Sequence, residues 1–199
     1  MPRSVKLSLN LDMGVRLVAP HLAGWANFYV IVGSSAGALI GLQFVVIALV
    51  SSTRTQPVSP AVRAFASPTI VYFSSVLLTG GLLSIPHHTR TSLGSVLVTL
   101  GAIGLAYVVR VGTHMTKQVQ YVPDRGDWTW FVFLPAASYV CSFIAGTMVW
   151  GAPGAALVVA GASAMLLLLV GVHNAWDSAV WMIVNPQNPP ATPPADRPG

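Results

Sequence analysis

The sequence predicts an all-α membrane protein, a bundle of about five transmembrane helices with room for an interfacial helix at its N-terminus. Of its 199 residues, 54% are apolar and only 8% are charged, whereas soluble domains are about a quarter charged. A globule of this size needs more polar surface than that to remain in water. Long stretches also lack Asp, Lys and Arg, and the stretch from Trp128 to Trp176 is long enough for two membrane helices.

The same composition excludes several classes of function. The chain has room for spans of about 20 residues and for little else, so we expect no soluble catalytic domain. A single cysteine, Cys141 in an apolar segment, excludes an internal disulfide framework and a multi-cysteine metal site. The net charge of +5 reflects membrane topology, because Lys and Arg mark the loops of membrane proteins. We therefore expect no nucleic-acid partner and no cofactor.

The first elements are an N-terminal extension, residues 1–24, and a first span, residues 28–50. Within the extension, apolar side chains recur on one face of residues 5–19, which favours a helix in the membrane interface. The span itself is an almost unbroken apolar run. Trp25 and Tyr29 stand at its start, where amphipathic aromatic side chains prefer the headgroup level.

Four further spans follow, with boundaries set by proline, glycine and charge. They cover residues 64–85, 92–111, 128–150 and 155–184. The last two are separated by the turn sequence Gly-Ala-Pro-Gly. Pro135 predicts a local kink in the fourth span, which is tolerable where a neighbouring helix satisfies the freed carbonyl. Residues 185–199 contain six prolines and predict a disordered, polyproline-like tail.

Five spans place the two ends of the transmembrane bundle, residues 25–184, on opposite sides of the membrane. We call the side of the N-terminus side A and the other side B. Lys and Arg are divided almost evenly between the loops of the two sides, but the connection between the last two spans carries none. The positive-inside rule then favours a cytoplasmic side B, with the N-terminus outside.

A stripe of glycines marks one face of the first span. Gly33, Gly37 and Gly41 follow one another at intervals of four residues, so they form one smooth line along the helix. Small residues let membrane helices approach closely, which drives their packing in lipid. The stripe therefore fits either a contact within the chain's own bundle, or a homo-oligomer interface or pore lining.

A polar stretch near the end of the fifth span is the strongest candidate site. His173 and Asp177 lie four residues apart on one helix face, and an Asp in a membrane segment is costly without a partner. Spans one, three and five run in the same direction, so Gln43, Tyr107 and Arg110 fall at a similar depth. We predict a polar cluster of these five residues in the side B half, with Arg110 as the partner of Asp177. The cluster fits a structural ion-pair network, an interfacial anchor, or a pathway for an ion or proton.

Catalytic and metal-binding signatures are missing from the sequence. It has no G-x-S-x-G, no H-E-x-x-H and no phosphate-binding Walker loop, and only one Asp lies in or near a span. His87 and His88 are expected to be exposed loop residues, because adjacent histidines rarely bind one metal together. We therefore predict no catalytic residue, no metal site and no enzymatic activity.

Two segments of the predicted bundle carry a recognisable combination of residues. They are Phe28-Tyr29-Val30 through Gly33-Ser34-Ser35-Ala36-Gly37 to Phe44-Val45-Val46, and Gly171-Val172-His173-Asn174-Ala175-Trp176-Asp177. Together they resemble a family of small, uncharacterised bacterial five-span integral membrane proteins. The resemblance covers most of residues 25–184 and implies a location in the bacterial inner (plasma) membrane. It implies no activity, cofactor or catalytic residue.

The leading hypothesis is a non-enzymatic, polytopic homo-oligomer that forms or regulates a membrane pathway for a small ion, as a channel or transporter does. The alternative is a scaffold or regulatory subunit of another membrane complex, contacted through the proline-rich tail or a side B loop. The expected partners are the lipid bilayer and either further copies of the chain or another membrane protein. A pathway needs polar residues that face a water-filled cavity, whereas a scaffold needs only a fold and a partner.

Overall fold

The chain is built from helices in the computed structural model, which describes residues 3–52, 60–116 and 124–184. The elements are α1 (Arg3–Ser52), α2 (Pro60–Leu83), α3 (Arg90–Met115), α4 (Arg125–Trp128), the π-helical turn η1 (Thr129–Phe133), α5 (Leu134–Met148) and α6 (Pro153–Val184). No strand occurs in these ranges, so the predicted all-α class is confirmed. The predicted proline-rich tail lies outside the described residues.

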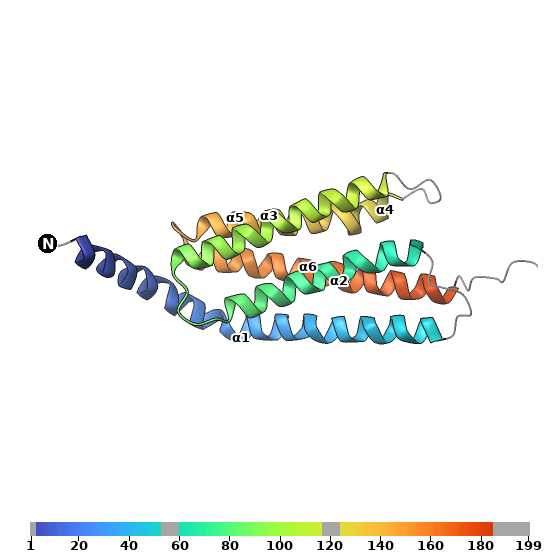
Figure 1. Ribbon diagram of the computed structural model, residues 1–199, viewed down its shortest axis with the longest axis horizontal. Coiled ribbons are helices and arrows are strands. Elements are labelled where there is room, and N and C mark those ends of the chain that lie inside the picture. The colour runs from blue at the N-terminus through green and yellow to red at the C-terminus, as the bar shows by residue number, and fades with distance from the viewer. Residues whose placement is uncertain (1–2, 53–59, 117–123, 185–199) are drawn as a thin grey trace, which may run out of the picture.

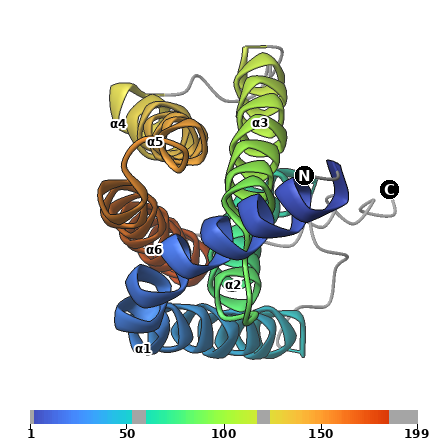
Figure 2. The ribbon, with the colours of Figure 1, turned by 90° about the vertical axis from the view of Figure 1, so that its left-hand side faces the viewer.

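The helices α1, α2, α3, α5 and α6 run side by side and form one bundle (Figure 1). Seen from the side A end, α2 and α6 lie between α1 and the pair formed by α3 and α5 (Figure 2). Helix α6 contacts α1, α2 and α5, while α3 packs mainly against α5. The connections at 84–89 and 149–152 lie at side A, and α1, α3 and α6 end at side B.

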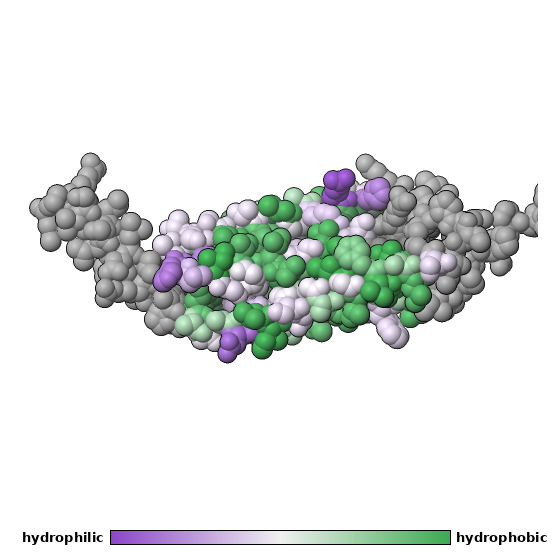
Figure 3. Space-filling view, turned by 60° about the horizontal axis from the view of Figure 1, so that its bottom comes forward, coloured by the Kyte–Doolittle hydropathy of each residue, from purple (hydrophilic) through white to green (hydrophobic). Residues whose placement is uncertain are grey.

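Four helical segments are long and apolar enough to cross a membrane, among the residues whose side chains are described. They are Leu22–Leu49, Arg90–Met115, Arg125–Met148 and Pro153–Val180. The described apolar part of α2, Ser67–Leu83, is shorter. Apolar and weakly polar residues dominate the surface between the two ends, and hydrophilic residues gather near the ends (Figure 3). Because so much exposed apolar surface is unfavourable in water, the bundle is that of a membrane protein in contact with lipid.

The first helix begins much earlier than the predicted first span. Helix α1 starts at Arg3 and continues without interruption through the predicted interfacial stretch, residues 5–19. Its N-terminal part projects beyond the side A end of the bundle (Figure 1). Tyr29 is fully buried between the helices, and its hydroxyl donates to the Leu157 carbonyl of α6 at 2.9 Å. A carbonyl near the side A end of the bundle thus supplies the polar partner that its hydroxyl needs.

The glycine stripe of α1 is divided between an inner and an outer role. Gly33 lies against Gly80 of α2, where a Cβ added to Gly33 would lie 3.3 Å from the Gly80 Cα. Gly37 faces the side chain of Leu77 at an ordinary contact distance. Gly41 is exposed and faces no described atom within 4 Å. The first part of the stripe therefore serves helix contact within the chain's own bundle.

A second glycine seam, which the sequence analysis did not predict, joins α3 to α5. A Cβ added to Gly101 would lie 2.7 Å from the Phe143 backbone nitrogen, and one on Gly146 would lie 2.7 Å from that of Val98. The ring of Tyr139 occupies the space where a side chain on Gly104 would be. Only glycine permits such an approach, and close packing of this kind holds helices together in lipid.

Candidate functional site

The candidate site is built around a break in the fourth predicted span, where η1 precedes Pro135. Pro135 has no N–H, so it cannot donate to the carbonyls of Phe131 and Trp130, four and five residues earlier. The backbone N–H of Leu134 reaches back five residues to the Thr129 carbonyl, which is the π-helical spacing. A π-helical turn therefore precedes Pro135, in the span where the sequence predicts a local kink.

Two buried side chains from other helices donate to these carbonyls. Tyr72 of α2 donates from Oη to the Phe131 oxygen at 2.7 Å, and Asn174 of α6 donates from Nδ2 to the Trp130 oxygen at 3.3 Å. Both donor residues are 0% exposed. The amide oxygen of Asn174, Oδ1, is buried and has no hydrogen-bond partner. Because an unpaired buried acceptor costs about 1–3 kcal/mol, a polar guest would be stabilised at this atom.

An exposed polar pair flanks Asn174 on α6. The imidazole of His173 stacks on the Trp130 ring, with centroids 3.6 Å apart, and its Nε2 lies 3.1 Å from Asp177 Oδ2. These side chains are 34% and 55% exposed, so the pair stands at the surface while Asn174 lies within. Their spacing predicts a shared helix face, and the structure places them on one. Two ionisable groups thus stand beside a buried polar residue in the side B half.

Hydroxyl side chains continue from this point into the bundle. The rings of Tyr72 and Tyr139 lie 6.5 Å apart, centroid to centroid. Tyr139 Oη and Ser75 Oγ of α2 are hydrogen-bonded at 2.8 Å, and either oxygen can be the donor. Next to Tyr139 on α5, the Ser138 carbonyl accepts a hydrogen bond from Ser163 Oγ of α6 at 2.7 Å. The site therefore joins α2, α5 and α6 through polar contacts in an otherwise apolar interior.

The remaining predicted cluster residues fall in different places. Tyr107 reaches the site, because its ring lies 6.4 Å from that of Tyr72 in an edge-to-face contact. Gln43 of α1 is 4% exposed, and its Nε2 is buried without a partner. Among the described residues, no hydrogen bond joins Gln43 to His173 or Asp177.

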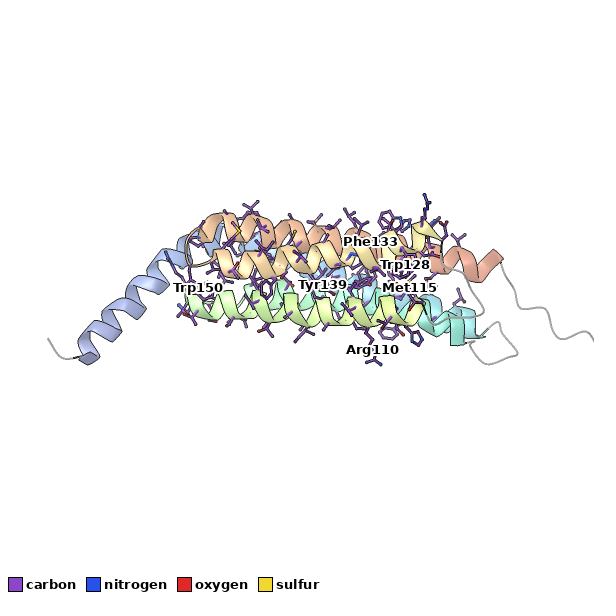
Figure 4. The ribbon with its side chains drawn as sticks, turned by 90° about the horizontal axis from the view of Figure 1, so that it is seen from above. Arg110, Met115, Trp128, Phe133, Tyr139 and Trp150 are labelled. Carbon is purple, nitrogen blue, oxygen red and sulfur yellow. The ribbon has the colours of Figure 1, made fainter. Side chains whose placement is uncertain are left out.

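The predicted pairing of Arg110 with Asp177 is wrong. Arg110 is exposed and points away from the bundle (Figure 4), and within the described residues no ion pair joins the two. Helix α3 turns its glycine face to α5, and Arg110 follows Gly101 by nine residues, which places it about 180° around the helix. The prediction rested on similar depth along the spans, and depth does not fix which face of a helix turns inward.

At side A, His88 is buried, contrary to the prediction that it is an exposed loop residue. Its Nε2 lies 2.7 Å from the Leu82 carbonyl oxygen, and its Nδ1 lies 2.9 Å from Ser92 Oγ. A carbonyl only accepts, so the neutral ring carries its hydrogen on Nε2 and accepts from Ser92 at Nδ1. His88 thereby ties the end of α2 to the start of α3. His87 is exposed, as predicted.

A groove of about 430 Å³ opens between α3 and the η1–α5 segment, in the side B half. It is lined mostly by apolar side chains, among them Val109. Trp128 and Phe133, which are labelled in Figure 4, also line it. Gly112 also lines it, and a Cβ there would meet the Trp128 ring only at 3.7 Å. The groove exists because the tight α3–α5 seam ends before η1 begins. It is apolar, so it offers a contact surface rather than an aqueous route.

Among the described residues, no group of three His, Cys, Asp or Glu side chains could hold a metal ion.

Three members of the site, Tyr72, Ser75 and Tyr139, were not predicted from the sequence. The available signal was Pro135, because a freed carbonyl in a membrane requires a donor from a neighbouring helix.

No family model matches this chain, and no curated protein or solved structure matches it either.

Proposed function

We propose that this membrane protein forms a pathway for a small ion, with its side B entrance at His173 and Asp177. The observation that supports the proposal best is Asn174, a fully buried residue whose Oδ1 has no partner and whose neighbours on α6 are ionisable and exposed. Buried polar groups are satisfied in most proteins, so an exception needs an explanation such as a guest ion or water. Ionisable residues inside membrane segments commonly mark ion and proton routes.

The π-helical turn adds to this proposal. Such turns occur frequently at functional sites, because they expose backbone groups that a regular helix would pair internally. Here the Trp130 carbonyl accepts a hydrogen bond from Asn174 of α6, and the Phe131 carbonyl accepts one from Tyr72 of α2. These groups are arranged for binding and transfer rather than for bond cleavage, and the proposed protein is not an enzyme.

The setting of the pathway is also part of the proposal. We place the protein in a bacterial inner membrane, with side B in the cytoplasm, and as a homo-oligomer. Gly41 supports the oligomer, because it continues the small-residue face of α1 but faces no described atom within 4 Å. A second copy of α1 would cover this position.

The test is ion flux into proteoliposomes that contain the purified protein, with Asp177→Asn measured beside the wild type. We expect the wild type to conduct and Asp177→Asn to conduct clearly less, because the variant removes the charge at the entrance. The matched control is Asp124→Asn, which also neutralises a side B carboxylate but keeps an acceptor for the Gly126 N–H at the start of α4. Equal flux in both variants and the wild type would contradict the assigned entrance.

A scaffold remains the second candidate, and the apolar groove between α3 and α5 is the observation that favours it. A helix from a partner membrane protein would find apolar side chains there and a backbone made accessible at Gly112. A photo-crosslinking amino acid at Val109, compared with one at the equally exposed Ile103 outside the groove, tests this in native membranes. One discrete adduct formed from Val109 alone would support the scaffold.

A further inference from the structure

We infer that the groove between α3 and the η1–α5 segment binds one acyl chain of a phospholipid from the membrane leaflet at side B. Such a lipid site is independent of the proposed ion pathway, because the groove opens on the outer surface of the bundle. A lipid and the helix of a partner protein would exclude each other from it. The depth, the lining, the charge at the rim and the size of the groove all favour the lipid.

The groove spans the depth of one leaflet. Its lining on α3 extends from Leu105 to Thr116, which is about 16 Å along the helix at about 1.5 Å per residue. The hydrocarbon core of a bilayer is about 30 Å thick, so each leaflet contributes about 15 Å. Thr116 directly follows Met115, the last residue of α3, at side B. The groove therefore runs from the headgroup level of side B toward the middle of the membrane, as an acyl chain does.

The groove is continuous with the lipid-facing surface of the bundle. Val109 of α3 and Phe133 of η1 line it, and they are 65% and 62% exposed. Both belong to segments that are long and apolar enough to cross a membrane, Arg90–Met115 and Arg125–Met148. Exposed apolar side chains in the hydrocarbon core are in contact with lipid chains. An acyl chain can therefore enter the groove sideways from the bilayer without crossing a polar layer.

Polarity changes along the groove as it does along a phospholipid. At the inner end the lining is apolar, with Leu105 and Ala136. Toward side B the lining includes the hydroxyl side chains of Thr113 and Thr116 and the indole ring of Trp128. Tryptophan favours the headgroup level of a membrane. The hydrocarbon chain would lie along the apolar end, and the polar ester groups of the lipid would lie near the hydroxyls.

The side B rim carries a positive charge that suits a phosphate group. Arg125 is exposed at the start of α4, one turn before Trp128. The two carboxylates of the same segment accept hydrogen bonds from backbone N–H groups, Asp124 from Gly126 and Asp127 from Asp124. The phosphate of a lipid whose chain fills the groove would lie at the level of the Arg125 guanidinium, and arginine is well suited to bind phosphate.

The size of the groove favours a chain over a helix. A helix with its side chains is about 10 Å across and rises about 5.4 Å per turn, so a volume of about 430 Å³ holds only about one turn. Methylene groups are about as large as water molecules, which occupy roughly 30 Å³ each, so the same volume holds about 14 of them. That is close to one acyl chain.

The experiment uses the full chain in phosphatidylcholine vesicles that contain a small fraction of phosphatidylglycerol with a photoactivatable diazirine in one acyl chain. After illumination, mass spectrometry maps the labelled residues. We expect severalfold more label at Val109 and Phe133 than at Leu169 of α6, which is 58% exposed. Leu169 is a suitable reference because it lies one turn before His173, whose ring stacks on Trp130 of η1, and so at a similar depth.

Two variants test the site itself. Gly112→Leu places a side chain in the groove, where a Cβ meets the Trp128 ring only at 3.7 Å, and should lower the label at Phe133 severalfold. The matched control is Gly81→Leu, whose Cβ would meet no described atom within 4 Å. Arg125→Gln should lower the label about fivefold, the usual contribution of one basic residue to binding an anionic lipid. Thermal unfolding of each variant establishes that it is folded.

Each outcome decides for or against the lipid site. Preferential labelling of the groove that is lost in folded Gly112→Leu and retained in Gly81→Leu supports it. Equal labelling of the groove and Leu169 would overturn it, because lipid would then contact the whole surface alike. Groove labelling that is unchanged in both Gly112→Leu and Arg125→Gln would overturn it as well. An unlabelled groove, together with a discrete protein adduct from a photo-crosslinker at Val109 in native membranes, would assign the groove to a partner helix instead.

Discussion

The two ends of the bundle use polar side chains in opposite ways. At side A, His88 and Arg90 direct their side chains at the ends of neighbouring helices, and Tyr29 bonds to the Leu157 carbonyl nearby. At side B, the pair formed by His173 and Asp177 is partly exposed and makes no such cap.

The helix termini explain the difference. The last carbonyls of a helix have no partner within it and must find one elsewhere. Near the end of α2, the Leu82 carbonyl accepts from the Ile85 N–H and is also hydrogen-bonded to His88, and Arg90 donates to the carbonyl of Trp150, two residues beyond the end of α5. At side A, His88 and Arg90 are thus bonded to carbonyls at the ends of helices, with Arg90 Nε left buried and without a partner, whereas at side B the Asn174 oxygen and the exposed pair remain available. A bundle can be fixed at one end and keep the other end for chemistry.

The largest loss of stability is expected from a substitution in the side A seam between α3 and α5. In Gly146→Ala the new Cβ would lie 2.7 Å from the Val98 backbone nitrogen and 2.8 Å from the Gly94 oxygen, so the helices must separate. We expect a loss of at least about 1–3 kcal/mol of stability, the usual cost of overpacking. The measurement is the denaturation midpoint in detergent or lipid.

Gly81→Ala is the matched control for the seam. Gly81 also lies inside a helix, but a Cβ there would meet no described atom within 4 Å. This variant should gain up to about 1 kcal/mol, because alanine loses less conformational freedom than glycine on forming a helix. A Gly146→Ala midpoint equal to that of Gly81→Ala would show that the seam is not tightly packed in the membrane.

The next largest loss of stability is expected at His88, which is hydrogen-bonded to the end of α2 and the start of α3 at side A. His88→Asn cannot satisfy both Leu82 and Ser92 as the imidazole does, so we expect about 1–3 kcal/mol of destabilisation. Hydrogen exchange at the end of α2 should rise in the same variant. The control is His87→Asn, because His87 is exposed with a φ of 64° and Asn tolerates that conformation. Similar behaviour of the two variants would mean that His88 does not hold side A closed.

The smallest stability effect is expected at side B. Tyr72→Phe removes the 2.7 Å hydrogen bond to the Phe131 carbonyl but keeps the ring, so the loss should be about 1 kcal/mol. Exchange of the backbone amides of η1 should increase while those of the α3–α5 seam stay protected. Tyr107→Phe is the control, because it removes the hydroxyl of a neighbouring half-buried residue and keeps the ring that lies in edge contact with Tyr72. Greater exchange across the whole bundle in Tyr72→Phe would argue that side B is as essential to the fold as side A.

Some of the site could be predicted from local pattern alone. The spacing of His173 and Asp177 places them on one helix face whatever surrounds the helix. Pro135 forces a disturbance because it lacks an N–H, and the need for donors from neighbouring helices follows from the absence of water in lipid. Which residues would be those donors could not be read from the sequence, because Tyr72 and Asn174 reach η1 only through the order of helices in the bundle.

The error at Arg110 has the same origin. Depth along a span follows from counting residues, since each adds about 1.5 Å to a helix. The rotation of a helix about its own axis depends on which face packs closely against a neighbouring helix. For α3, that face is the line of glycines against α5. Arg110 lies on the opposite face and therefore points outward.

The sequence by itself determined that this chain is a helical membrane protein. Composition and the length of uncharged segments set that class, because an apolar run of about 20 residues spans a bilayer as an α-helix, whose backbone hydrogen bonds are all made within the segment. Only the tertiary structure decided that Tyr29 and His88 belong to the interior, that α3 pairs with α5, and that Tyr72 and Asn174 meet at η1. These features depend on contacts between helices far apart in the chain, and local sequence carries no record of which neighbour a helix face will find.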